Sequence, residues 1–583
     1  MIQMKDHIAK ALSEAVGISS DDVKALFTQP PQPAMGDIAF PCFQLAKTLR
    51  KAPALIAGDL KENIDHRLAN PSDPLAKVVD RVDAVGAYLN FFLRRDTFAE
   101  EVIRASILAG NRPGASEEGK GKTVIVEYSS PNIAKPFHVG HGFSTFLGEA
   151  IANLYEYAGY NVERFNHLGD YGTQFGKLIV AWKRWGNPEA LKEAPISELT
   201  RIYVKFHDEV ELLPDLEDEA RQAFTRLEQG SEEEMTLWHQ FRRVSLDEFN
   251  DTYERVNIHF DNMNGESFYA KMTSEVVDLL SEKRLLVESE GAQIVDLEDH
   301  GLNPCLILKN DGSTIYATRD IAAVLYRDRM WNFFRNIYVV GIPQINHFNQ
   351  IFAVMEKLGM PNPERNVHVA FGTVRFADGV FSTRKGNIVL LDELLDAGVA
   401  HARAIVKESH PDLGDAEIDE IAERIGVGAV RYTYLASGRE RDILFSWEDI
   451  LDYEGDTAPY LLYTVTRCVS LLRKAEPFVL KRLEERGFED AALLIGDDEQ
   501  RVLKEIVLFP ESLAAARAHY EPSMMLRRLM QLARAFNTFY HSTPILRTDD
   551  TALVVARLAL VQAVERTLKA GLRIAGIEPV DRM

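Results

Sequence analysis

One stretch in the first quarter of the chain prescribes a strand, a turn and a helix in a fixed order. Residues 123–128 form a short β-branched, apolar run that predicts a buried strand. Pro131 and Pro136 prevent regular strand pairing and an early helix, so the chain must turn between them. Apolar residues then recur at helical spacing over 143–158, and Gly159 predicts the helix end. This order is typical of a ligand site at the carboxyl end of a parallel strand, where open sheets bind nucleotides.

Two histidines follow the turn. His138 and His141 are three residues apart, so they share one face of a first helical turn. The unpaired N–H groups and the positive dipole end of a helix start favour anions, and two imidazoles add donors for a phosphate. Such donors stabilise charge that develops on a phosphoryl group during displacement, and Gly140 lets a base or phosphate approach the backbone. Taken alone, the pair is equally compatible with surface polar residues or with two metal ligands.

The alternation of strands and helices continues along the chain. Further strands are predicted within 162–172, 337–341 and 366–372, which favours an α/β fold with a doubly wound parallel sheet and right-handed crossovers. Residues 176–260 are mostly helical and acidic, and we interpret them as an insertion without assigning them any chemistry. Residues 287–308 alternate apolar and polar side chains, which predicts the strands of a meander.

The two ends of the chain have different patterns. Residues 1 to about 115 predict a small α+β domain, in which a strand pair flanks Gly86. From about residue 422 onward the pattern is almost wholly helical and predicts a bundle. Three arginines within 527–534 lie off its apolar stripe and give it a basic side, which a solvated helix face would also explain.

Composition limits the classes of function. At ~150 residues per domain, 583 residues suggest about four units. The 66 basic and 88 acidic residues give a net charge of −22, which does not exclude RNA because local basic patches drive such binding. Three widely separated cysteines argue against a disulfide framework and a cysteine-rich zinc site. The sequence shows neither a signal peptide nor an apolar run approaching ~18 residues, so we expect a cytoplasmic protein without membrane contact.

The string Ser-Ser-Pro-Asn-Ile-Ala-Lys-Pro-Phe-His-Val-Gly-His at 129–141 closely resembles the "HIGH" signature of class I aminoacyl-tRNA synthetases, in the form carried by arginyl-tRNA synthetases. Residues 35–47 resemble the N-terminal domain of that family, which contacts the tRNA elbow. Residues 458–467, 532–540 and 576–583 resemble its anticodon-binding domain. The resemblance therefore covers nearly the whole chain.

This resemblance implies three domains and one reaction. The domains are an N-terminal tRNA-contacting domain at 1–115, a Rossmann-like class I catalytic domain at 120–445 with its insertion at 176–260, and a helical anticodon-binding domain at 446–583. The implied enzyme is an arginine–tRNA ligase that forms arginyl-adenylate from ATP and transfers arginine to the 3′ end of tRNA(Arg). Its implied partners are L-arginine, ATP with Mg²⁺ on the phosphates, and tRNA(Arg), without a tightly bound cofactor or a metal held by side chains. The family is usually monomeric, and it typically needs bound tRNA before it activates arginine.

The resemblance also implies the residues that bind ATP. They are Pro131, Asn132, Ile133, Ala134, Lys135, Pro136, Phe137, His138, Val139, Gly140 and His141 of the first motif, with Ser382 of a second motif. That second motif, "KMSKS", is a lid loop whose lysine stabilises the ATP phosphates. Here Thr383 stands where the second lysine is expected, so the catalytic cation is sought among Lys135, Arg384 and Lys385, beside His138 and His141. A basic surface loop is the alternative for this stretch.

Arginine recognition requires a carboxylate for the guanidinium. The resemblance assigns this role to Asp320, with Tyr316 closing over it and Gln344 in the same pocket. The remaining residues that the resemblance places around arginine are Glu127, Ser130, Asn132 and Glu266. A surface ion pair of Asp320 with Arg319 or Arg327 is the alternative. Because a guanidinium pocket rejects other amino acids strongly, we expect no editing site.

For tRNA, Tyr460, Tyr463 and Met583 are the implied contacts, because unpaired anticodon bases are read by stacking and edge hydrogen bonds. Core packing is the alternative for both tyrosines. Two alternatives remain for the whole chain: another class I specificity, and a catalytically silent relative that only binds tRNA. The intact pair of histidines argues against the second alternative.

Overall fold

The computed structural model describes residues 2–361, 363–376, 389–452 and 455–583. The chain forms two compact units, each built from several stretches. Unit 1 comprises Met1–Gly114, Thr464–Glu511 and Arg528–Ala570, and unit 2 comprises Ala115–Tyr463, Ser512–Arg527 and Gly571–Met583. Within the described ranges, no helix combines the length and the apolarity needed to cross a membrane.

A parallel sheet of four strands lies at the centre of unit 2. Its strands, in the order in which they pair, are β10 (Asn366–Phe371), β9 (Arg335–Gly341), β4 (Thr123–Glu127) and β5 (Asn161–Phe165). The strands predicted from the sequence and their parallel arrangement are therefore confirmed. From β4 the chain moves to β5 on one side, whereas β9 pairs on the other side of β4. This reversal is a topological switch point, and it makes a crevice for ligands at the carboxyl ends of β4 and β9.

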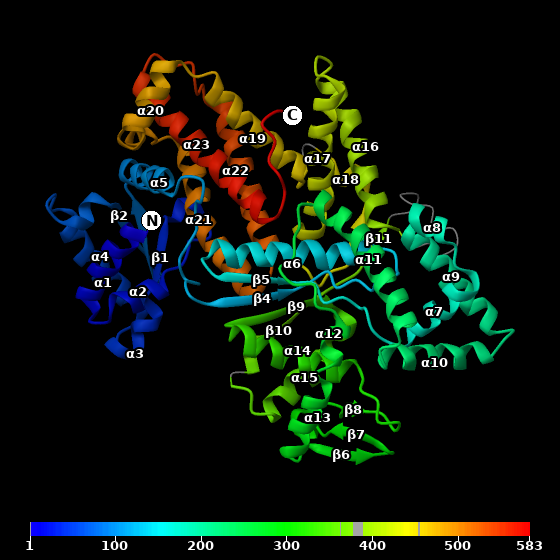
Figure 1. The fold of residues 1–583 in the computed structure, drawn as a ribbon. Helices are drawn as coiled ribbons and strands as arrows, with labels where there is room; N and C mark the ends of the chain where they lie inside the picture. The colour runs from blue at the N-terminus through cyan, green and yellow to red at the C-terminus, as the bar shows by residue number, and fades with distance from the viewer. Residues whose placement is uncertain (1, 362, 377–388, 453–454) are drawn as a thin grey trace. The chain divides into compact units, whose positions relative to one another are not determined.

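Helices cover both faces of this sheet. Helix α6 (Val139–Tyr157) lies on one face, and α14 (Tyr316–Trp331) and α15 (Ile345–Lys357) lie on the other (Figure 1). Because side chains alternate along a strand, Ile125 and Glu127 of β4 point to the same face. Ile125 belongs to the hydrophobic core that α14 and α15 form, so Glu127 faces α14 as well.

The rest of unit 2 is an insertion, two small sheets and further helices. The insertion contains α7 (Thr173–Trp185), α8 (Pro188–Glu193), α9 (Pro195–Val210), α10 (Asp215–Glu228) and α11 (Glu232–Arg255). After it come α12 (Glu266–Ala270), α13 (Thr273–Glu282) and the predicted meander, β6 (Leu286–Ser289), β7 (Ala292–Val295) and β8 (Cys305–Leu308). Strands β11 (Val374–Phe376) and β12 (Ile443–Phe445) pair in parallel. The later helices are α16 (Leu391–Ser409), α17 (Asp415–Ala436), α18 (Trp447–Ile450) and the start of α19 (Ala458–Arg473), which belongs to unit 1 from Thr464 onward.

Residues 571–583 pack into the interior of unit 2. Asn153 of α6 donates a hydrogen bond to the Ile574 carbonyl at 3.2 Å. Arg431 of α17, which is 1 % exposed, donates to the Gly576 carbonyl at 2.8 Å. Ile577 and Val580 are buried, with 1 % and 2 % of their surface exposed. These contacts make the last stretch a structural part of the unit that contains the sheet.

Unit 1 combines a small α+β region with helices from much later in the sequence. The early elements are α1 (Ile2–Val16), α2 (Ser20–Leu26), β1 (Ile38–Pro41), α3 (Ala46–Leu49), α4 (Pro53–Leu68), β2 (Val79–Val85), β3 (Tyr88–Leu93) and α5 (Arg95–Ala109). The strands pair antiparallel in the order β1-β3-β2, which confirms the predicted pair around Gly86. The later helices that contribute to this unit are α20 (Pro477–Asp490), α21 (Asp497–His519), α22 (Ser523–Ser542) and α23 (Thr551–Ile574).

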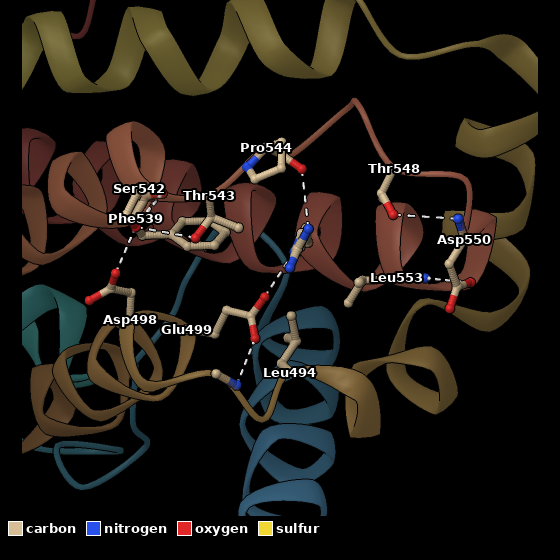
Figure 2. A network of polar contacts seen from close by, with 12 residues as sticks. Leu494, Asp498, Glu499, Phe539, Ser542, Thr543, Pro544, Thr548, Asp550 and Leu553 are labelled. Carbon is tan, nitrogen blue, oxygen red and sulfur yellow. Dashed lines mark hydrogen bonds and ion pairs between the residues drawn. The ribbon is translucent and has the colours of Figure 1, made fainter.

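Polar contacts fix the start of α21 in this unit, as Figure 2 shows. The Ser542 hydroxyl donates to Asp498 at 2.6 Å. Glu499 accepts hydrogen bonds from the backbone N–H of Gly496 at 2.9 Å and from the Arg557 guanidinium at 2.8 Å. Both carboxylates lie in the first turn of α21, where the helix dipole favours negative charge. The acidic residues at this position are therefore structural.

Candidate active site

The turn after β4 contains three residues in the left-handed region of backbone space. Ser129, Ser130 and Ala134 have φ values of 69°, 48° and 60°. None of them is glycine, so each conformation carries a steric cost of about 1–2 kcal/mol. Such conformations persist only where the surroundings over-determine them, and they cluster at active sites.

The first part of the turn is fixed by hydroxyl groups. The backbone N–H of Ser129 donates to the hydroxyl of Ser144 in α6 at 3.0 Å. The Ser129 hydroxyl lies 2.7 Å from the hydroxyl of Tyr253 in α11 and accepts a hydrogen bond from Thr145 at 2.8 Å. All four side chains are buried, so water does not replace these bonds.

The rest of the turn is held from two other elements. The backbone N–H of Ser130 donates to the amide oxygen of Asn166, just after β5, at 3.2 Å. The backbone N–H of Ala134 donates to the hydroxyl of Ser245 in α11 at 2.9 Å. Asn132 lies between them and forms a backbone bridge with Gly169. The insertion, to which we assigned no chemistry from the sequence, therefore supplies through α11 two of the side chains that shape this turn.

His138 and His141 cap the start of α6. The Nδ1 of His138 accepts a hydrogen bond from the Gly140 N–H at 3.1 Å, and the Nδ1 of His141 accepts one from the His138 N–H at 3.2 Å. Burial lowers the pKa of His138, and burial together with the charges of His138 and Lys135 lowers the pKa of His141 to about 3. Both rings are therefore neutral at pH 7, and because Nδ1 accepts, each proton is on Nε2. The stacked rings, 3.8 Å between centroids, offer their Nε2–H groups as donors.

Gly140 also has a structural reason. A Cβ at this position would lie 2.9 Å from Cε1 of the His138 ring. The histidine cap therefore favours glycine here, and the approach of a base or phosphate to this backbone stays a prediction. Phe137 stacks on His141 with 5.1 Å between ring centroids, and Lys135 is exposed.

The base of the lid pairs with this turn. The Val139 N–H donates to the Val389 carbonyl at 3.1 Å, and the Leu391 N–H donates to the Phe137 carbonyl at 3.0 Å. The predicted lid residues Ser382, Arg384 and Lys385 lie outside the described residues. The chain that follows the lid is thus attached directly to the two residues that flank His138.

Asp320 lies in the first turns of α14, opposite α15. Its Oδ2 is 2.6 Å from Nε2 of His347, and the rings of His347 and Tyr316 are 4.9 Å apart. Tyr316 is 55 % exposed, which leaves its ring free to move over a ligand. Gln344, in the short 3₁₀ turn Ile342–Gln344 that precedes α15, is exposed.

The alternative of an ion pair between Asp320 and a neighbouring arginine does not occur. The Arg319 guanidinium donates to Glu266 at 3.1 Å. The Arg327 guanidinium donates to Glu127 at 2.5 Å. Both arginines have other carboxylates as partners, so Asp320 remains available to a guanidinium that can displace or share His347.

Three of the predicted carboxylates are grouped around α14: Asp320 lies on this helix, and Glu266 and Glu127 bind its Arg319 and Arg327. Burial raises the pKa of the Tyr338 hydroxyl, and the charges of both Glu127 and Asp320 raise it further, while Arg327 opposes the rise. Burial also raises the pKa of Glu266, and the nearby charge of Asp320 adds to it. Each carboxylate has a basic neighbour, which is Arg327 for Glu127, Arg319 for Glu266 and His347 for Asp320.

Comparison with known proteins agrees with this geometry. The family model for the class I tRNA synthetase (R) catalytic domain matches residues 103–447. The models for the arginyl tRNA synthetase N terminal domain and the DALR anticodon binding domain match residues 3–93 and 461–583. The arginine–tRNA ligase of Clostridium perfringens is 45% identical over 586 residues, which cover 99% of this chain and 100% of that protein.

The chain belongs to the arginyl-tRNA synthetases. The arginine–tRNA ligase of Clostridioides difficile is also 45% identical, with all of both chains covered. The crystal structure of Thermus thermophilus arginyl-tRNA synthetase has 27% sequence identity and a TM-score of 0.81, and the match covers 100% of this chain and 99% of that one. The predicted family, fold class and enzyme class, an arginine–tRNA ligase, are therefore confirmed. The site must accommodate ATP, arginine and tRNA.

The residues predicted to contact tRNA lie far from the predicted arginine-binding residues in the sequence and differ in exposure. Tyr463 of α19 is 40 % exposed, whereas Tyr460 and Met583 are half-buried. Their role in this arginyl-tRNA synthetase stays a prediction.

Several residues that build the synthetase site were missed in the sequence. Asn166 follows β5 directly, so the sheet-edge argument applied to β4 could have found it. Ser245 and Tyr253 occur in an acidic helix without any distinguishing pattern, and His347 was not singled out. Arg327 was considered only as a partner of Asp320.

Proposed function

We propose that this arginyl-tRNA synthetase binds arginine between β4, α12 and α14 and activates it at the start of α6. Asp320 holds the guanidinium with Tyr316 and Gln344, and Glu266 adds negative charge to the pocket. Glu127, Ser130 and Asn132 hold the α-amino and carboxylate groups. The observation that supports this most is the grouping of Glu127, Glu266 and Asp320 around α14, through their contacts with Arg327, Arg319 and His347.

The first chemical step takes place on the ATP α-phosphorus. An oxygen of the arginine carboxylate attacks this phosphorus, the bond to the β-phosphate oxygen breaks, and pyrophosphate leaves. The Nε2–H groups of His138 and His141 donate to the phosphoryl oxygens as charge develops there, and neutral donors fixed by the helix cap need no reorganisation. Lys135 supplies a cation, together with Arg384 or Lys385 of the lid.

The second step transfers arginine to tRNA. A hydroxyl of the 3′-terminal ribose attacks the carbonyl carbon of arginyl-adenylate, and AMP leaves. Residues 1–115 and 446–583 are proposed to hold the tRNA, with Tyr460, Tyr463 and Met583 at the anticodon. We propose that the enzyme acts as a cytoplasmic monomer.

Mg²⁺ is proposed to arrive on the ATP phosphates. Within the residues that the structure describes, no group of three or more His, Cys, Asp or Glu side chains could hold a metal ion. A Mg²⁺ ion bound chiefly by the ATP phosphates and by water needs no such group of side chains, because Mg²⁺ keeps much of its water shell. When bound, it would neutralise phosphate charge.

The test combines pyrophosphate exchange with one substitution. Exchange between ATP and labelled pyrophosphate should depend on arginine among the amino acids, and it should be far stronger with tRNA(Arg) than without it. The Asp320→Asn variant should weaken arginine binding by about 100-fold, because a buried hydrogen bond to a charged group contributes about 1.5–3 kcal/mol. Its KM for ATP should not change. Unchanged arginine affinity in Asp320→Asn, or exchange driven by another amino acid, would contradict the assignment.

A further inference from the structure

Arg327 is a cation in the interior of unit 2. It lies on α14, and its side chain has no solvent exposure. Its guanidinium carbon is 4.6 Å from the ring centroid of Phe165, 5.5 Å from that of Tyr338 and 5.9 Å from that of Tyr269. Ring faces attract cations, so the three aromatic residues fix this guanidinium in place.

Arg327 binds one oxygen of Glu127 and leaves the other available. Its Nη2 donates to Glu127 Oε2 at 2.5 Å, and His167 Nδ1 lies 3.8 Å from the same oxygen. Within the described part of the chain, Glu127 Oε1 accepts no hydrogen bond, and Nε and Nη1 of Arg327 have no hydrogen-bond partner. The ion pair raises the pKa of Arg327 although burial alone would lower it, so the guanidinium stays charged.

Helix α14 contributes residues to both ends of the proposed arginine site. Asp320, at the guanidinium end, lies on this helix itself. Arg327 follows seven residues later, about 10 Å along the helix axis, and holds Glu127 of β4. One rigid element thus positions both carboxylates.

We propose that Arg327 is a positioning residue of the arginine site, which holds the carboxylate of Glu127 in the orientation in which its Oε1 receives the α-ammonium group of arginine. The inference rests on the proposed function, because Glu127 has its role there. Without Arg327, Glu127, which has 6 % of its surface exposed, would lose its charged partner and keep His167, 3.8 Å from its Oε2. Its carboxylate would then turn toward another partner, away from the orientation that receives an ammonium group.

The experiment compares arginine with 5-guanidinopentanoate, which has the same guanidinium and carboxylate but no α-amino group. Calorimetric titration of the full chain gives both dissociation constants. The ratio of the dissociation constant of 5-guanidinopentanoate to that of arginine measures how much the α-ammonium group contributes to binding. We expect this ratio to fall by about 10- to 100-fold in Arg327→Met, the range for a charge-assisted hydrogen bond. In Arg327→Lys, a point charge replaces the planar fork, and the ratio should be intermediate. ATP binding should stay at the wild-type level.

Two further variants separate the possible outcomes. Arg329→Met is the matched control, because Arg329 lies on the same helix but forms a surface ion pair with Glu275, at 54 % exposure. Its ratio should equal that of the wild type. Glu127→Gln should lower the ratio like Arg327→Met, and the double variant should lower it no further.

The refuting results are distinct for the two proposals. A wild-type ratio in folded Arg327→Met, together with a lowered ratio in Glu127→Gln, overturns the inference about Arg327 and leaves the proposed function intact. A wild-type ratio in Glu127→Gln overturns the assignment of Glu127 in the proposed function. Should Arg327→Met not fold, Arg327→Lys decides: an intermediate ratio supports the inference, and a wild-type ratio overturns it.

Discussion

The hydrogen bond between Ala134 and Ser245 gives the sharpest test of how the insertion supports catalysis. The Ala134 N–H donates to the Ser245 hydroxyl at 2.9 Å, and Ser245 has no exposed surface. In Ser245→Ala this buried donor has no partner, at a cost of about 1–3 kcal/mol. The left-handed conformation of Ala134, at φ 60°, itself costs about 1–2 kcal/mol.

The free energy of this hydrogen bond and the free energy of the backbone strain are thus similar. Removing the bond lets the turn leave its catalytic conformation. We expect kcat of tRNA-dependent pyrophosphate exchange to fall about 10-fold, since each 1.36 kcal/mol changes a rate by a factor of ten. The thermal midpoint, measured in parallel, separates loss of the turn from loss of the fold. The matched control is Thr225→Ala on α10, where an exposed hydroxyl bonds only to the Arg221 carbonyl of its own helix.

A compensating variant makes the reasoning refutable. Glycine adopts positive φ without a steric cost, so Ala134→Gly should restore most of the lost rate when it is combined with Ser245→Ala. A Ser245→Ala enzyme with the wild-type kcat would refute the idea that this bond holds the turn. A double variant no faster than Ser245→Ala would refute the idea that backbone strain is the cause.

Two further predictions concern α6. Because burial lowers the pKa of His141 to about 3 from an ordinary 6.5, its imidazole should remain neutral in NMR titrations down to pH 4.5, with the resonance assigned by His141→Gln. Below pH 6.5 the unfolded chain binds a second proton on the His141 imidazole and the folded chain does not. The free energy of unfolding should therefore decrease as the pH is lowered from 6.5 to 3, by up to about 1.4 kcal/mol per pH unit. A His141 resonance that shifts near pH 6.5 would contradict this. In Gly148→Ala the added Cβ would lie 2.2 Å from Cβ of Tyr128, so the thermal midpoint should drop by several degrees from a strain of about 1–3 kcal/mol. Gly58→Ala, where nothing lies within 4 Å, is the control and should be neutral or stabilising, and equal midpoints in the two variants would rule out the predicted clash.

Local sequence patterns predicted the strand, turn and helix between residues 123 and 159 because each depends on neighbours a few positions away. The spacing of the two histidines also explains how they cap α6, although from the sequence we interpreted them as ligand-binding or surface residues and not as caps. Ser245 is 111 residues from Ala134, and a serine in an acidic helix gives no signal that it meets a strained turn. Contacts of this kind depend on the packing of the insertion, which periodicity does not encode.

The partners of charged residues were equally difficult to predict. From proximity in the sequence, Asp320 could form an ion pair with Arg319 or with Arg327. The structure gives each arginine a different carboxylate, because the pairing of β9 with β4 brings Glu127 to the buried side of α14. The register of the sheet decides such pairs, and one sequence alone does not reveal that register. The compact units combine early and late segments of the chain, and the domain limits expected at 115 and 446 stay a prediction.

The burial of residues 571–583 in unit 2 has a consequence for protein synthesis. The ribosome makes the four strands of the sheet before it reaches residue 372, but the carbonyl of Gly576 that binds Arg431 emerges some 200 residues later. At typical rates of about 5–20 residues per second, the nascent sheet waits at least ten seconds for this partner. Arg431 is made 145 residues before Gly576, and until Gly576 follows, Nη1 of Arg431 has the Val256 carbonyl but not the second of its two acceptors. A chain that ends within α23 therefore lacks one of the contacts that stabilise the unit containing the parallel sheet.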